Sequence, residues 1–199
     1  MNPIAKKSAG PLKPFAAALL AGGKSRRMGS DKALLPVESD GRFLPLWEKQ
    51  WDLLKSLEPG EMLFSGLERP GLPADLRFLA DRWDAGPLGG IATCLDEIHT
   101  QWLLVVAVDM PKVTSICLAE MLHAAIDSGT GIIPVLSDKF EPVIAIYPKA
   151  ALQIAVEQIQ QSNFKLQDFA RELLSTGLIK KWNVPLRFAP CFKNWNQPE

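Results

Sequence analysis

The residues best suited to chemistry in this chain form one loop, Leu20–Lys32, in which three glycines stand among four basic side chains. Glycines let the backbone turn sharply and approach a ligand closely. Backbone N–H groups, lysine and arginine together can neutralise the charge of a triphosphate. A solvated basic loop has a similar composition, but so much glycine and positive charge directly after an apolar run favours a phosphate-binding loop.

Two common phosphate-binding motifs do not fit this loop. Gly23-Lys24-Ser25 imitates the end of a P-loop, but Ala18 stands where that motif requires a glycine, five positions before Gly23. The dinucleotide-binding pattern GxGxxG is also missing from the loop. ATPase and dehydrogenase functions therefore lose their main support.

A second candidate segment, Asp81–Gly90, turns through Gly86-Pro87 into a predicted helix whose first turns contain Gly89 and Gly90. Each glycine costs about 1 kcal/mol inside a helix. We therefore expect a flat base or a ribose to lie against this backbone. The alternative is tight packing of the helix against a strand.

A third candidate is Asp109, which follows the strongest strand signal in the chain, Trp102–Val108. A carboxylate at the end of a buried strand is suited to hold a hard cation such as Mg²⁺ through oxygen. The alternative is an aspartate that caps the following turn, with Thr114 as the N-cap of the next helix.

Hydrophobic patterning predicts the scaffold that must position these segments. We expect strands at 15–20, 62–64, 76–80, 102–108, 131–136 and 143–147, weaker strands at 178–184 and 186–192, and helices at 46–57, 87–98, 114–127, 149–159 and 166–174. Alternating strands and helices predict an α/β, three-layer, Rossmann-like fold with a mostly parallel central sheet and helices on both faces. Ligands bind such sheets at the carboxyl ends of the strands.

Length and composition set the remaining limits. The 199 residues suit one domain, which we place at 15–199 after a disordered leader at 1–14. Equal numbers of basic and acidic residues, 22 of each, argue against a nucleic-acid partner. The apolar run Phe15–Ala21 is short for a secretory signal, and no run approaches the roughly 20 apolar residues of a membrane span. We expect a cytoplasmic protein, a monomer or weak homo-oligomer, without a membrane or nucleic-acid partner.

The cysteines and histidines give no sign of a site. Cys94, Cys117 and Cys191 have neither disulfide nor zinc spacing, and we interpret each as a small, buried or half-buried apolar residue. His99 and His123 are isolated in the sequence, and we assign neither of them a metal or a catalytic role.

The loops together resemble the molybdenum cofactor guanylyltransferase family of the nucleotidyltransferase superfamily. The pattern LAGGxSxRMGxDKxLL is present as Leu20–Leu35, GPLxGI as Gly86–Ile91, and D-[MT]-P as Asp109–Pro111. A segment like EPVIAIYP stands at Glu141–Pro148, and N-x-N-x-P-E at Asn194–Glu199. The resemblance runs from about Phe15 to the last residue.

The resemblance implies an enzyme that moves GMP from GTP onto the phosphate of a molybdopterin cofactor, with Mg²⁺, and releases pyrophosphate. In the family, the backbone at the positions of Leu20, Ala21, Gly22 and Gly23 contacts the nucleotide, and the resemblance adds Gly86 as a further contact. Lys32, Arg27 and Lys24 match the residues that bind the phosphates, and Asp81 matches the residue that contacts the base. Asp109 and Asn196 match the residues that bind the metal. Ser65 stands where the family often has asparagine, which puts a base or ribose contact from this residue in doubt.

Three hypotheses remain open at this point. The first is the GTP-dependent guanylyltransferase, with other proteins of molybdenum cofactor biosynthesis or molybdoenzyme maturation as candidate partners. The second is a sister enzyme that uses CTP on molybdopterin, or a nucleoside triphosphate on a sugar phosphate. The third is a non-catalytic nucleotide-binding protein, against which the intact Lys32 and Asp109 argue. The sequence alone does not determine the base.

Overall fold

A sheet in the strand order β10-β7-β9-β6-β1-β4-β5, with the short β8 paired to β7, forms the centre of the computed structural model. The structure describes residues 14–22, 31–39, 41–68, 72–73 and 76–193. The strands of this sheet are β1 (Ala16–Ala21), β4 (Glu61–Gly66), β5 (Phe78–Leu79), β6 (Trp102–Ala107), β7 (Gly131–Leu136), β8 (Lys139–Phe140), β9 (Ile144–Pro148) and β10 (Ile179–Asn183). The helices are α1 (Leu46–Lys55), α2 (Gly86–Glu97), α3 (Ser115–Ser128), α4 (Ala151–Gln160) and α5 (Leu166–Ser175).

Strands β1 and β6 are apolar without interruption because both of their faces are covered. In β1, Ala17 and Leu19 belong to one buried cluster, while Ala18 and Leu20 belong to the other. The same alternation holds along β6. The two apolar runs from which we predicted these strands are therefore a direct consequence of the three-layer arrangement.

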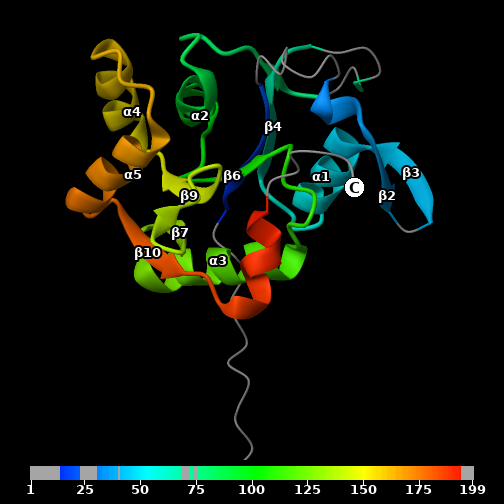
Figure 1. Cartoon of the computed structure of the whole chain (residues 1–199). Coiled ribbons are helices and arrows are strands. Elements are labelled where there is room, and N and C mark those ends of the chain that lie inside the picture. The colour runs from blue at the N-terminus through cyan, green and yellow to red at the C-terminus, as the bar shows by residue number, and fades with distance from the viewer. Residues whose placement is uncertain (1–13, 23–30, 40, 69–71, 74–75, 194–199) are drawn as a thin grey trace, which may run out of the picture.

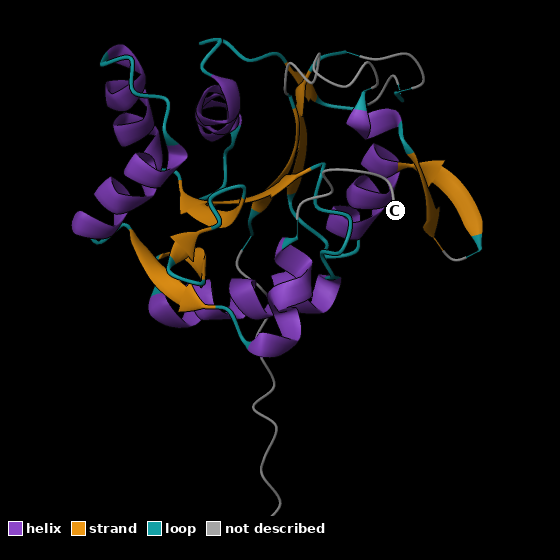
Figure 2. Ribbon diagram, in the orientation of Figure 1, coloured by secondary structure: helices purple, strands orange, loops and turns teal. Residues whose placement is uncertain are grey.

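The two clusters also show which helices cover each face. Side chains of α1 and α3 lie in one cluster, and those of α2, α4 and α5 lie in the other. Figures 1 and 2 show the corresponding layers, with α2, α4 and α5 on one side of the strands and α1 and α3 on the other. The predicted fold class is thus confirmed.

The strand directions decide which loops can meet. β1 is parallel to both β4 and β6, β4 is parallel to β5, and β7 is parallel to β10. Strand β9 is antiparallel to both β6 and β7, so it begins at the edge where the parallel strands end. The loops after β1, β4, β5 and β6, together with the segment before β9, therefore lie along one edge of the sheet.

One predicted strand is wrong. Leu186–Phe192 is a short 3-10 helix, η2, rather than a strand. Pro185 precedes it and Pro190 lies inside it, and neither residue has the backbone N–H that a sheet would require. The Phe188 N–H instead bonds to the Pro185 carbonyl at 2.8 Å, while the side chains of Phe188, Cys191 and Phe192 are buried against the sheet.

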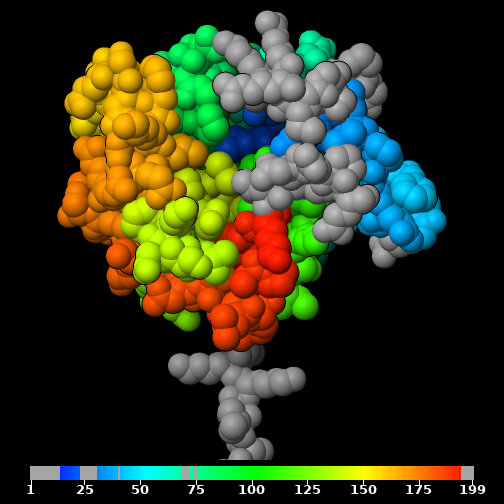
Figure 3. Space-filling model, in the orientation of Figure 1, coloured from blue at the N-terminus to red at the C-terminus, as the bar shows by residue number. Residues whose placement is uncertain are grey.

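The sequence analysis also missed four small elements. The 3-10 turn η1 (Lys32–Leu34) follows the candidate phosphate loop, and β8 forms a short hairpin with β7. Strands β2 (Pro36–Ser39) and β3 (Arg42–Pro45) pair antiparallel as a separate two-stranded sheet. The β2–β3 hairpin projects from the side of the molecule in Figure 3. Its four-residue strands are too short to give a clear alternation of apolar and polar residues.

Two other expectations concern the burial of the cysteines and the length of the helices. Cys94, Cys117 and Cys191 are all free and buried, as predicted. Within the described ranges, each helix is too short or too polar to cross a membrane.

Candidate active site

The end of β1 lies in close contact with its two neighbouring strands. The Leu20 carbonyl accepts the N–H of Val108 at 2.9 Å, just beyond the end of β6. On the other side, Gly66 ends β4 so close to β1 that a Cβ there would lie 2.7 Å from the Ala21 carbonyl carbon. The first residues of the candidate phosphate loop are thus fixed by backbone contacts, and Figure 3 shows dark-blue residues of β1 at the bottom of a hollow between α2 and the β2–β3 side of the molecule.

Lys32 and Asp109 come together at this edge, although 76 positions separate them in the sequence. The Lys32 Nζ lies 3.9 Å from the Asp109 Oδ2, and the two side chains are 22% and 32% exposed. Lys32 begins η1, and Asp31 caps that turn by accepting the N–H of Ala33 at 3.1 Å. A cation and a carboxylate that remain partly open to solvent can exchange this contact for a charged ligand.

The turn that carries Asp109 is held from inside the protein by Gln50. The Gln50 Nε2 donates to the Met110 carbonyl at 2.6 Å, and only 1% of Gln50 is exposed. Its Oε1 is buried without a hydrogen-bond partner. The sequence analysis missed this residue, but a signal existed: Gln50 interrupts the apolar stripe of α1 between the buried residues Leu46 and Leu54.

Asp81 follows β5 and lies over the first turns of α2. Its Oδ1 accepts the N–H of Trp83 at 2.9 Å. A Cβ on Gly89 would lie 2.6 Å from the Asp81 Oδ2, so this carboxylate lies directly against the glycine. A Cβ on Gly90 would lie 3.0 Å from the Ser65 Oγ. Protein side chains therefore approach both glycines, as tight packing of the helix would require, while a base or ribose against this backbone stays a prediction.

Ser65 is the second-to-last residue of β4, beneath the same helix, and is 3% exposed. Its hydroxyl lies close to Gly90 of α2, and its hydrogen bonding lowers the pKa of the Cys94 thiol. Burial raises the pKa of Cys94 to about 12 in spite of that bond. The Ser65 side chain thus points into the protein, and its proposed contact with the nucleotide stays a prediction with little support from this geometry.

Other predicted site residues divide into those that the structure describes and those that it does not. Gly86 begins α2, is exposed, and has a left-handed φ of 62°. Gly23, Lys24, Arg27 and Asn196 lie outside the described residues.

The sequence analysis gave no role to the segment that precedes β9, which also reaches this edge. The Val143 carbonyl accepts the N–H of Ala107 at 2.9 Å, two residues before Asp109. Burial raises the pKa of the half-buried Glu141 above its usual value, although the positive charge of Lys139 opposes the shift. The segment therefore reaches the end of β6 through its backbone, while the Glu141 backbone N–H bonds to Pro134 of β7.

The charged groups at this edge suit a metal ion that arrives with a nucleotide. Among the described residues, no three His, Cys, Asp or Glu side chains are grouped so as to hold a metal by themselves. Asp109 offers carboxylate oxygens beside the Lys32 ammonium. Mg²⁺ is commonly bound by one or two carboxylates together with substrate phosphates, and Asp109 fits that arrangement.

The three-layer fold, with Lys32 and Asp109 together at one edge of its sheet, agrees with the nucleotidyltransferase class that the sequence predicted. A model of the family described as MobA-like NTP transferase domain matches residues 17–176, and the chain belongs to this family. A probable molybdenum cofactor guanylyltransferase of Opitutus terrae is 31% identical over 190 residues, covering 93% of this chain and 92% of the relative. Another, of Methanothermobacter thermautotrophicus, is 32% identical over 194 residues, covering 92% and 94%.

Solved structures share the fold at lower identity. Molybdopterin-guanine dinucleotide biosynthesis protein A of Archaeoglobus fulgidus superposes with a TM-score of 0.72 at 23% identity, covering 92% of this chain and 93% of that one. The 2-C-methyl-D-erythritol 4-phosphate cytidylyltransferase of Thermus thermophilus gives a TM-score of 0.65 at 16% identity, with 91% and 92% covered.

Proposed function

We propose that this chain transfers GMP from GTP to the phosphate of molybdopterin, with Mg²⁺, in the cytoplasm. The observation that carries the proposal is the contact between Lys32 and Asp109 at the carboxyl ends of β1 and β6. The names of the relatives from Opitutus terrae and Methanothermobacter thermautotrophicus support guanine as the base and molybdenum cofactor as the product class.

In the proposed reaction, an oxygen of the acceptor phosphate attacks the α-phosphorus of GTP. A new P–O bond forms there while the bond from the α-phosphorus to the bridging oxygen breaks, and pyrophosphate leaves with the electron pair. Because the acceptor phosphate is already ionised at neutral pH, no strong general base is needed. Catalysis then rests on positioning and charge neutralisation.

Each charged residue has a distinct task in this scheme. Lys32 holds the phosphates and stabilises the charge that develops on pyrophosphate. Asp109 orients Lys32 and would hold Mg²⁺ together with the phosphates. When bound, the ion would supply charge neutralisation and orientation of the reacting phosphates. We propose that Arg27 and Lys24 add positive charge near the β- and γ-phosphates, and that Asn196 completes the metal or acceptor site.

The Asp81 carboxylate supports guanine over adenine and cytosine on chemical grounds. Guanine presents two adjacent N–H donors on its Watson–Crick edge, and the two oxygens of a carboxylate can accept both. Adenine and cytosine place a ring nitrogen acceptor at the corresponding edge, which a carboxylate repels. The cytidylyltransferase that shares the fold shows that the fold by itself does not select the base.

A panel of four nucleotides and two acceptors tests the proposal. The purified chain is incubated with Mg²⁺ and GTP, ATP, CTP or UTP, with molybdopterin or a sugar phosphate, and pyrophosphate release is measured. We expect turnover with GTP and molybdopterin. GTP at 100 times its Kd should also stabilise the fold by about 2.7 kcal/mol. Equal thermal shifts from all four nucleotides would contradict guanine selection, and turnover only with the sugar phosphate would overturn the acceptor.

A further inference from the structure

The turn that carries Asp81 depends on α2 for its position. Within the turn, the Trp83 N–H bonds to the Asp81 carboxylate, which fixes the carboxylate relative to its own backbone but not relative to the rest of the site. The carboxylate also lies against Gly89 of α2. A small movement of the turn over the helix would therefore move both carboxylate oxygens together.

One buried hydroxyl connects this turn to the helix. The Thr93 Oγ1 accepts the N–H of Arg82 at 3.3 Å and donates to the Gly89 carbonyl at 2.8 Å. Arg82 directly follows Asp81 in the chain, and Gly89 is the residue on which the Asp81 carboxylate lies. Thr93 is 1% exposed, so water does not compete freely for either hydrogen bond.

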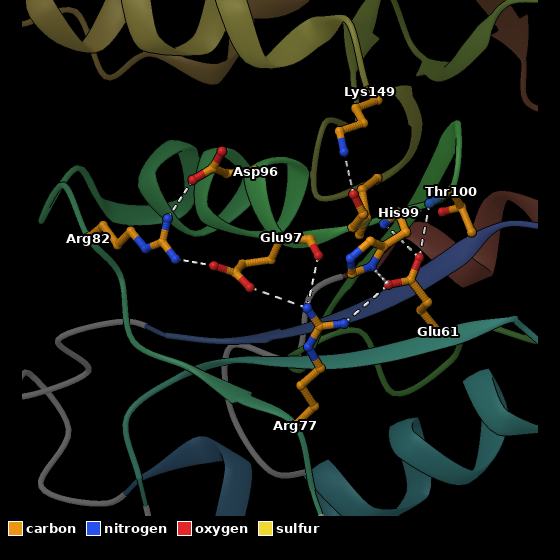
Figure 4. Close-up of polar contacts among 9 residues, drawn as sticks. Glu61, Arg77, Arg82, Asp96, Glu97, His99, Thr100 and Lys149 are labelled. Carbon is orange, nitrogen blue, oxygen red and sulfur yellow. Dashed lines mark hydrogen bonds and ion pairs between the residues drawn. The ribbon is translucent and has the colours of Figure 1, made fainter.

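The Arg82 side chain adds a second connection between the turn and α2. Its guanidinium pairs with Asp96 and Glu97 near the end of the helix, as Figure 4 shows. Glu97 in turn contacts Arg77, and Arg77 contacts Glu61 at the start of β4. Because the Arg82 side chain is 49% exposed, we expect these surface pairs to contribute less than the buried Thr93 hydroxyl.

We propose that Thr93 is a positioning residue for base selection: its hydroxyl holds the 81–83 turn against Gly89 so that the Asp81 carboxylate faces the guanine edge. This inference rests on the proposed function and assigns part of its specificity to a residue that does not touch the nucleotide. It requires only that the two hydrogen bonds of Thr93 restrict the position of the turn more than the hydrogen bond between Asp81 and Trp83 within the turn does.

Substitution at Thr93 separates the hydroxyl from the shape of the side chain. Thr93→Val keeps the branched shape and removes both hydrogen bonds, whereas Thr93→Ser keeps the hydroxyl and removes only a methyl group. Hydrogen bonds to charged groups are among the stronger ones. A carboxylate that no longer meets the base should therefore lower the preference for guanine about tenfold, which corresponds to about 1.4 kcal/mol.

The experiment measures kcat and KM for GTP and ATP in the wild type, the two Thr93 variants and Thr176→Val. Thr176 is a control for loss of a threonine hydroxyl away from the site, because its hydroxyl also bonds to a helix carbonyl, at the exposed end of α5. We expect Thr93→Val to raise KM for GTP and lower the GTP-to-ATP ratio of kcat/KM about tenfold, with little change in kcat. Thr93→Ser and Thr176→Val should keep the wild-type ratio.

The outcomes separate this inference from the function on which it rests. A wild type without preference for GTP contradicts the proposed function. A wild type that prefers GTP, together with a folded Thr93→Val variant that keeps the full preference, overturns the role of Thr93 alone. If Thr93→Val does not fold, Thr93→Ala removes the same two hydrogen bonds with a smaller side chain: a lower GTP preference than in Thr93→Ser supports the inference, and an unchanged one contradicts it.

Discussion

Replacing Gly66 by alanine should disturb the candidate nucleotide site without adding any polar or charged group. Gly66 is buried at the end of β4, with a φ of 157° that L-amino acids rarely adopt. A Cβ at this position would lie 2.7 Å from the Ala21 carbonyl carbon, and 2.8 Å from both the Ala21 oxygen and the Gly22 nitrogen. All three atoms belong to the peptide that begins the candidate phosphate loop, so the substitution must move backbone.

The expected loss of unfolding free energy in Gly66→Ala is the sum of two costs. A residue held in a disfavoured region of φ and ψ costs about 1–3 kcal/mol, and overpacking of a buried site costs about 1–3 kcal/mol. We therefore expect Gly66→Ala to lower the free energy of unfolding by about 4 kcal/mol. For a chain of this length, such a loss lowers Tm by about 8–16 °C. Because the Ala21–Gly22 peptide has to shift, KM for GTP should rise as well.

Gly177→Ala is the matched control. Gly177 also has a positive φ, of 73°, but a Cβ there would meet nothing within 4 Å. This variant isolates the backbone cost, which we expect to be about 1–2 kcal/mol, and it should leave KM unchanged. Urea unfolding of both variants measures the difference between their free energies of unfolding. If Gly66→Ala is no less stable than Gly177→Ala, then the close contact between β4 and the start of the loop does not constrain the site.

Three further predictions follow from the charges and thiols. Lys32→Ala should lower kcat/KM about 10²–10³-fold through lost stabilisation of phosphate charge, while Lys55→Ala at the exposed end of α1 should not; equal kinetics for the two variants would remove Lys32 from the site. Burial opposes the charge of Glu61, but hydrogen bonds from the 99–100 segment and the arginine contact outweigh it and hold the pKa below 4.5. The stability that Glu61→Gln removes should therefore be fully present above pH 4.5 and decrease as the pH falls through the folded-state pKa; a difference in urea unfolding that does not decrease as the pH is lowered below 4.5 would refute this. Burial raises the pKa of Cys94 and Cys117 to about 12, so a thiol-specific reagent should modify both only after unfolding, and rapid reaction of the native protein would contradict their burial.

The central strands were predictable because burial on both faces leaves an uninterrupted apolar run. The predicted ranges 15–20 and 102–108 agree with β1 and β6 to within a residue at each end. The range 186–192 also has several large apolar residues, yet it forms η2. There the apolar residues pack onto the sheet from outside, and the backbone constraint of Pro190 outweighs the composition.

That Lys32 and Asp109 lie at the same edge of the sheet was predictable, since neighbouring parallel strands end at the same edge; their direct contact was not. The supporting residues were harder to predict. Gln50 and Thr93 act on backbone atoms of Met110 and of Arg82, and sequence patterns identify a buried polar residue without identifying its partner. The two glycines of α2 were recognised as a close contact, but the contacting groups are side chains of the protein itself.

The central claim is that Asp109 belongs to a nucleotidyl-transfer site, and one measurement tests it most directly. Pyrophosphate release from GTP in the presence of molybdopterin and Mg²⁺ is compared for the wild type, Asp109→Ala and Asp127→Ala, a control at an exposed position of α3. We predict turnover by the wild type and by Asp127→Ala, and loss of turnover in Asp109→Ala with its fold retained. A folded Asp109→Ala variant that releases pyrophosphate at the wild-type rate would contradict the account.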